Sequence, residues 1–325
     1  MKLNKPFHPL MFQATLAAGG VALMPFNFLQ FAIPHGKGLI TLSHITETTF
    51  TGLQAALYYP LIAVMLVFVA LHFGLTAVLL KTLAAWLSEK GKFKAFMDDP
   101  YNNVGMFAII SSLSMTANVF WAPLGFFFPS ISNNLQSFML PSLIFFGVLW
   151  LSVLILELRV MKVWFTNEIE ITRYNFIWLL DVFAFALVNL TGTGIAAMSA
   201  DTQIASMAAF ASIVTLTVGV FLFALKLIYL IFLQIKKHAL PDKPILPAFF
   251  LVIPITCLFG LSFYRIGTYL QANLSMELQG FSFFILNFSY VITIAWGIFC
   301  IYLLSDYLKN HFADSSFSYP QWGMV

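Results

Sequence analysis

The sequence predicts an all-α polytopic membrane protein. Of its 325 residues, 60% are hydrophobic and only 9% are charged, whereas soluble domains carry about 25% charged residues. The apolar residues gather in long stretches, without the short alternating segments typical of a β-barrel. Helices of about 20 apolar residues cross a bilayer while pairing their own backbone polar groups, so helices are the expected element throughout.

Eight stretches are long and apolar enough to cross the bilayer. The first is longer than the apolar core of a cleaved signal peptide, about 7–15 residues, so we expect an uncleaved span. In order, the expected spans lie at about 9–34, 55–80, 104–128, 138–163, 176–199, 205–233, 245–269 and 280–304, and they form a single transmembrane domain over residues 1–325.

The seventh span is expected to be bent. It has no charged residue between Ile245 and Tyr264. Pro247 falls in the first turn, where a missing N–H costs little, whereas Pro254 lies mid-span and should bend the helix near Phe250. Irregular helices occur at membrane depth where they face protein or a water-filled path. We therefore interpret this span as an inner, pore-facing helix, with a kinked packing helix as the alternative.

Positive charge is distributed asymmetrically about the spans. Thirteen of the 16 Lys and Arg residues lie at the amino terminus, in the loops that follow even spans, or in the tail. Lys37 and Arg265 lie on the other side, and Lys226 lies inside the sixth span. Lys and Arg favour cytoplasmic loops, so we expect both ends of this chain to be cytoplasmic. The amino ends of the odd helices would then gather at the cytoplasmic mouth, where helix dipoles and basic loops attract anions.

A repeat underlies the spans. Most odd spans begin near a Pro or Tyr followed by aromatic residues, and the anchor aromatics Phe12, Phe107, Trp178, Phe249 and Trp322 are 95, 71, 71 and 73 residues apart. This spacing accommodates one helical hairpin per repeat. The sequence therefore predicts four helical hairpins around a central pore and the start of a fifth.

Four passages resemble the tellurite-resistance/dicarboxylate transporter (TehA-type) family, which includes the plant guard-cell slow anion channels. They are QATLAAGGVAL, DDPYNNVGMFAIISSLSM, LPDKPILPAFFLVIPITCL and SFSYPQWGMV, and the resemblance covers essentially the whole chain. It implies ten helices in five hairpins around a quasi-fivefold axis, odd helices that line the pore, and a homotrimer in which each protomer has its own pore.

This sequence departs from the family pattern in two ways. It supplies eight spans and the start of a ninth, so we expect the natural chain to continue beyond Val325 if it keeps the family's full fold. The family's occluding phenylalanine belongs to the ninth helix, and we carry it over to no position here. Asp181 stands where family members often place a proline.

The odd spans carry small polar groups at helical spacing, and Ser111, Ser114 and Asn118 share one face. Hydroxyls and amides can bind a passing anion weakly, as conduction requires, although the same groups can also bond packed helices together. Phe250 and Phe107 are candidates for an occluding ring, and Arg265 either attracts anions at the outer mouth or snorkels. The pore-lining candidates are Gly19, Gly20, Phe107, Ser111, Ser114, Asn118, Asn189, Thr193, Phe250, Pro254 and Arg265.

Three other intramembrane groups receive structural interpretations. We expect Asp181 to pair with a loop cation, Lys226 to snorkel to the interface, and His72 to be a packing or lipid-edge residue. Haem between helices would need paired intramembrane histidines, and no hydrolase or metalloprotease motif is present. We therefore expect no cofactor, metal or catalytic residue.

Taken together, the sequence predicts an anion channel or transporter in the plasma (inner) membrane. It would move small inorganic or carboxylate anions through a pore lined by odd helices, and no basic tract points to nucleic acid. A proton-coupled C4-dicarboxylate carrier is the alternative within transport, and a membrane-embedded enzyme or receptor is the alternative of another class. The anion, the gate and the gating signal remain open.

Overall fold

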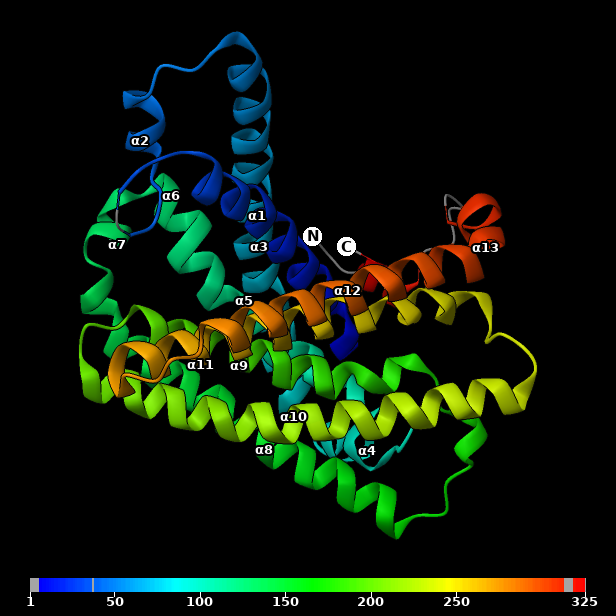
Figure 1. Ribbon diagram of the computed structural model, residues 1–325. Coiled ribbons are helices and arrows are strands. Elements are labelled where there is room, and N and C mark those ends of the chain that lie inside the picture. Colours follow the sequence, from blue (N-terminus) through cyan, green and yellow to red (C-terminus); the bar gives the residue numbers. More distant parts are fainter. Residues whose placement is uncertain (1–5, 37, 313–317, 325) are drawn as a thin grey trace.

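The computed structural model describes residues 6–36, 38–312 and 318–324. Some residues used above lie outside these ranges: Lys2, Lys5 and Lys37 of the charge count, and Ser316, Phe317 and Val325 of the closing motif. Within them, eight helices are long and apolar enough to cross a membrane (Figure 1). The expected all-α polytopic fold class is thereby confirmed. The eight are Pro9–Ala32, Gly52–Ser88, Asn103–Phe127, Leu135–Thr166, Phe176–Met198, Thr202–Lys237, Lys243–Leu274 and Gln279–Leu303.

Each odd span starts with a short 3₁₀ segment, which we call its lead segment. The lead segments and their helices are η1 (Pro9–Met11) with α1 (Phe12–Ala32), η2 (Asn103–Met106) with α5 (Phe107–Val119), η6 (Phe176–Leu179) with α9 (Leu180–Met198), and η7 (Lys243–Leu251) with α11 (Val252–Leu274). A fifth, η8 (Tyr319–Met324), ends the described chain. The five anchor aromatics lie in these segments or immediately after them, so the sequence repeat corresponds to a repeated local structure.

The even spans are regular α-helices. They are α3 (Gly52–Ser88), α8 (Met139–Thr166, preceded by η4, Leu135–Phe138), α10 (Thr202–Lys237) and α12 (Gln279–Leu303). Asp201 caps α10, because its Oδ1 accepts hydrogen bonds from the N–H groups of Gln203 and Ile204. Short helices fill the connections: α2 (Leu42–Glu47), α4 (Lys92–Asp98), α7 (Pro129–Asn133), η5 (Ile171–Arg173) and α13 (Ser305–Asn310).

The odd helices form an inner layer. In their most apolar stretches 61–89% of residues are buried, against 11–33% in the even helices. α1 packs on α5, α5 on α9 and α9 on α11, while the lead segments contact one another in the order η1, η2, η6, η7, η8. η8 also packs on α1, and the Tyr319 ring stacks on His8 at a centroid distance of 5.7 Å. The five lead segments therefore form a closed ring.

His8 helps to hold this closure. Its Nδ1 accepts a hydrogen bond from the Leu10 N–H at 3.2 Å. Burial lowers the pKa of His8, which favours the neutral ring that can act as an acceptor.

The even helices lie outside. α3 packs on α1, α10 on α9 and α12 on α11, while α8 packs on both α5 and α9. Their outer faces carry many exposed large apolar side chains, as expected of a surface in contact with lipid. One indole group ties the two layers together, because Trp296 Nε1 of α12 donates to the Phe249 carbonyl of η7 at 2.8 Å. Another joins two outer helices, because Trp150 Nε1 of α8 donates to the Ala211 carbonyl of α10 at 2.8 Å.

The irregularity in the seventh span differs from the expected bend. Pro254 is only the third residue of α11, where an N–H would have no partner within the helix, so it does not break a continuous helix. The irregular part is η7, which contains Pro247 and Phe250. The hydrogen bond from Trp296 satisfies one of its backbone carbonyls. The third span holds a second irregularity that we did not predict, a π-helical turn at Phe120–Leu124 around Pro123 that leads into α6 (Gly125–Phe127).

Two expectations about intramembrane charges were wrong. Asp181 pairs with Lys226 of α10, not with a loop cation. Lys226 is only 4% exposed and does not snorkel, because Asp181 provides a counter-ion at its own depth. His72 is a packing residue, with Nδ1 donating to the Thr15 carbonyl at 2.7 Å and Nε2 lying 3.0 Å from Thr116 Oγ1.

Candidate functional site

A cavity of about 500 Å³ lies between the inner helices, and we call it the central cavity. Side chains from α1, α5, α9, α11 and two lead segments line it. Most are apolar, including Leu16, Met115, Leu187 and Trp322. Within the described residues its lining contains no charged side chain, so an ion inside it would meet only weak sites.

Gln13 supplies a polar group to this cavity. Its side chain is 5% exposed, and its Oε1 has no hydrogen-bond partner among the described residues. A buried amide without a partner is costly unless water or a solute satisfies it. Gln13 therefore suits an aqueous path better than a packing contact.

Three of the candidates from the sequence line the central cavity: Gly20, Phe250 and Pro254. A Cβ atom at Gly20 would meet nothing within 4 Å, so the α1 backbone borders open space there. Phe250 is half-buried in η7, and Phe183 of α9 is the other phenylalanine in the lining.

Four candidates serve packing instead. A Cβ atom at Gly19 would lie 2.5 Å from Met115 Cγ, so this glycine permits close contact of α1 with α5. Ser114 Oγ lies 2.7 Å from Thr191 Oγ1, and Asn118 Nδ2 donates to the same Thr191 oxygen at 3.0 Å. These two polar groups join α5 to α9, which is the alternative that the sequence left open. Phe107 is fully buried in the core and is not among the lining residues.

Three further polar candidates also lie away from the central cavity. Ser111 Oγ and Asn189 Nδ2 are buried without hydrogen-bond partners in the described chain. Asn189 Oδ1 accepts a hydrogen bond from Thr215 of α10 at 3.4 Å, and Thr193 donates to the Asn189 carbonyl at 2.9 Å.

Arg265 lies in the half of α11 remote from its lead segment and is half-buried. Its Nη1 donates to the Leu190 carbonyl of α9 at 3.1 Å, and a Cβ atom at Gly194 would lie 3.4 Å from the same nitrogen. No carboxylate among the described residues forms a salt bridge with it. Arg265 thus offers a positive charge between two inner helices.

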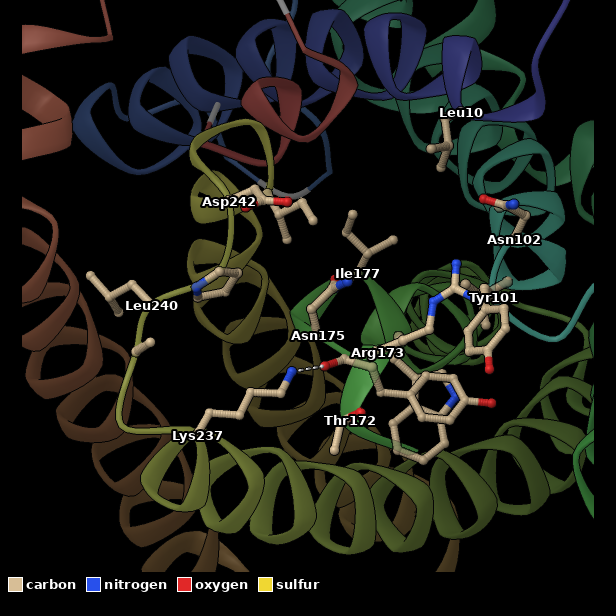
Figure 2. A pocket seen from close by; sticks show the side chains of 17 residues that line it. Leu10, Tyr101, Asn102, Thr172, Arg173, Asn175, Ile177, Lys237, Leu240 and Asp242 are labelled. Carbon is tan, nitrogen blue, oxygen red and sulfur yellow. Dashed lines mark hydrogen bonds between the residues drawn. The ribbon is translucent and has the colours of Figure 1, made fainter. Parts of the chain in front are cut away.

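A second cavity of about 670 Å³, which we call the vestibule, lies where the odd helices begin (Figure 2). Arg173 and Lys237 are its cations, and Asp242 is the one acidic residue in its described lining. The Arg173 guanidinium lies 4.0 Å from the centroid of the Tyr101 ring. Lys237 Nζ donates to the Tyr174 carbonyl at 3.4 Å.

The vestibule and the central cavity follow one another along the inner layer. On the first odd span, Leu10 lines the vestibule and Gln13 the central cavity; on the seventh, Ile245 and Phe250 do the same. The helix amino ends at the vestibule carry positive dipole potential, which its two cations reinforce. The arrangement can concentrate anions at one end of an uncharged passage.

Sequence reasoning did not select Arg173 and Lys237 as site residues, because they served only in the count of loop charges. A usable signal was present: Arg173 lies five residues before the anchor Trp178, and Lys237 lies in the tail of the span before η7. If the repeated odd helices surround a pore, basic residues close to the start of such a helix lie near the mouth of that pore.

Comparison with models of protein families matches residues 6–325 to one described as SLAC1, voltage-dependent anion channel. The searches of curated proteins and of solved structures give no match.

Proposed function

The chain belongs to the voltage-dependent anion channel (SLAC1) family, and from this we propose that it conducts small inorganic or carboxylate anions through the vestibule and the central cavity. Family membership indicates an anion channel or transporter in a membrane as the general function. The observation that best supports the proposed route is the ring of lead segments with the inner helices behind it, which surrounds two cavities in series.

The chemistry of the route favours anions without trapping them. Arg173 and Lys237 raise the anion concentration at the vestibule, whereas the central cavity supplies the Gln13 amide and no charge in its described lining. Conduction needs binding weak enough to allow exit. Arg265 would provide a second attractive point toward the other end.

Other parts of the proposal concern the setting. We place the protein in the plasma (inner) membrane with its amino terminus cytoplasmic, because the basic loops lie on the side where odd helices begin. A homotrimer with one pore per protomer and TehA-type ten-helix subunits are proposed from the resemblance. The exposed Asn27 and Cys257 border the central cavity on the side between α1 and α11.

Flux in liposomes tests the function. The full natural chain, purified and reconstituted, is expected to pass chloride or a C4-dicarboxylate down its own gradient, with or without a pH gradient. Empty liposomes give the background. Flux that disappears without a pH gradient would instead indicate a proton-coupled dicarboxylate carrier. If no anion crosses faster than in empty liposomes, the proposal is wrong and an enzyme or receptor function has to be considered.

The vestibule makes a separate prediction. Lys237→Gln is expected to lower anion flux about twofold to fivefold at low salt, since one partly screened surface charge contributes up to about 1 kcal/mol. The effect should vanish near 1 M salt, where the Debye length is about 3 Å. The matched control is Lys236→Gln, because Lys236 is exposed and does not line the vestibule. Equal effects of both variants, or an effect independent of salt, would contradict this role for Lys237.

A further inference from the structure

A carboxyl–lysine cluster lies between three membrane-spanning helices, behind the central cavity. Its members are Glu157 of α8, Asp181 of α9 and Lys226 of α10, which are 3%, 0% and 4% exposed. Lys226 Nζ forms a salt bridge with Asp181 and donates to the Trp178 carbonyl at 3.2 Å. The same ammonium lies 4.3 Å from the centroid of the Trp164 ring. The Lys226 ammonium is thus satisfied by a carboxylate, a backbone carbonyl and an aromatic ring.

The Glu157 carboxyl, by contrast, lacks hydrogen-bond donors to either oxygen among the described residues. It nevertheless lies within hydrogen-bonding reach of Asp181. Two ionised carboxylates cannot donate to each other. A contact between these two carboxyls is therefore favourable only when one of them carries a proton, and an unpaired carboxylate buried in this way would be very costly.

We propose that the cluster is a proton-binding site in which Glu157 and Asp181 share one exchangeable proton opposite Lys226, and that loss of this proton weakens anion conduction. With the proton bound, the cluster is neutral: one carboxylic acid, one carboxylate and one ammonium. Without it, the cluster has a net charge of about −1. The effect on conduction rests on the proposed function, whereas the proton site does not.

The position of the cluster explains the link to conduction. Asp181 and Phe183 lie two residues apart and hence on nearly opposite faces of α9, and Phe183 lines the central cavity. The cluster is thus separated from the cavity by about one helix diameter, roughly 10–12 Å. At an effective dielectric constant of about 20, one negative charge at that distance lowers the occupancy of a monovalent anion about tenfold.

Other charged and titratable groups near the cluster are engaged elsewhere. On α8, Arg159 forms a salt bridge with Asp98 at 3.6 Å and lies over the Phe93 ring. Tyr229 of α10 packs against the Trp178 ring, and the pKa of Tyr174, which stacks on the same ring, is raised by burial, so that it stays neutral.

The other inner helices add no charge to the cluster of Glu157, Asp181 and Lys226. The α5 segment contains no ionisable side chain, and Arg265 of α11 bonds the Leu190 carbonyl, nine residues along α9 from Asp181. The charges that act on Glu157 are those of Asp181 and Lys226.

Flux at equal pH on both sides of the membrane tests the coupling. Wild-type flux is expected to fall about tenfold as the pH rises through the range in which the proton leaves. Glu157→Gln cannot lose a proton and should keep the high flux throughout. Glu168→Gln is the matched control, because Glu168 is exposed in the following loop, and it should follow the wild-type profile. A Glu157→Gln protein with the wild-type profile would overturn the coupling.

Infrared spectroscopy tests the proton site without transport. The C=O band of a protonated carboxylic acid is expected in the wild-type protein and in Glu168→Gln, and it should be absent in Glu157→Gln. If that variant does not fold, ¹³C-labelled glutamate in the wild-type protein should shift the band. If the C=O band neither shifts on labelling nor disappears on substitution, it does not come from Glu157 and the proposal is wrong. The band without any anion flux would instead retain the proton site and reject the proposed function.

Discussion

Lys226→Met is expected to destabilise the protein by about 3–5 kcal/mol, the usual cost of removing one partner from a buried ion pair. The substitution leaves the buried carboxyls of Asp181 and Glu157 without their cation. Methionine fills a similar volume, so lost packing contributes little. Thermal or denaturant unfolding of the purified protein in detergent measures the change.

A matched substitution and a double variant separate charge from other effects. Lys236→Met, at an exposed position on the same helix, should change stability by about 0.5 kcal/mol or less. Asp181→Asn combined with Lys226→Met should regain much of the loss, because the two sites are directly coupled. If Lys226→Met were as stable as Lys236→Met, the buried pair would not stabilise the fold.

The layer order could be predicted from the sequence, whereas the ion pair could not. The repeated anchors distinguished odd spans from even ones, and the resemblance to the TehA-type family implied that the odd helices lie inside. Asp181 and Lys226 are 45 residues apart, and their contact depends on the rotation of α9 against α10. Periodicity does not determine that rotation when both helices are apolar on nearly every face.

Helix rotation, which the sequence does not determine, also decides where the small polar candidates lie. Ser114 and Asn118 share a face with Ser111, as predicted, but the first two face Thr191 of α9. A pattern of hydroxyls marks a face that avoids lipid and does not distinguish a neighbouring helix from a water-filled path. Small residues are equally ambiguous. Gly19 lies where α1 crosses α5, whereas its neighbour Gly20 lines the central cavity.

The lead segments show where local sequence did carry information that we interpreted incompletely. Proline and aromatic residues at the start of odd spans predicted a repeat of helical hairpins, without a prediction of their local structure. In the structure they form 3₁₀ turns whose mutual contacts close a ring. Because Pro247 lacks an N–H and the Phe249 carbonyl bonds to Trp296, η7 keeps a tighter winding than α11 and presents Phe250 to the central cavity.

Phe250→Ala is expected to raise basal anion flux about tenfold or more. The ring lines the central cavity from η7, and an apolar ring in a narrow passage obstructs ions both by its volume and by excluding water. Lowering the barrier by about 1.4 kcal/mol suffices for a tenfold rise. Single-channel current or liposome flux in the full natural chain measures it.

Two further substitutions make the result specific to Phe250. Phe288→Ala removes an exposed ring from the outer helix α12 and should leave flux unchanged, which controls for general loosening of the bundle. Phe183→Ala removes the other phenylalanine ring from the cavity lining. It should add to the effect of Phe250→Ala if both rings narrow the same passage, because each substitution then widens it further. Unchanged flux in Phe250→Ala would show that this ring does not occlude the pathway, and the narrowest point would then have to lie elsewhere along the inner helices.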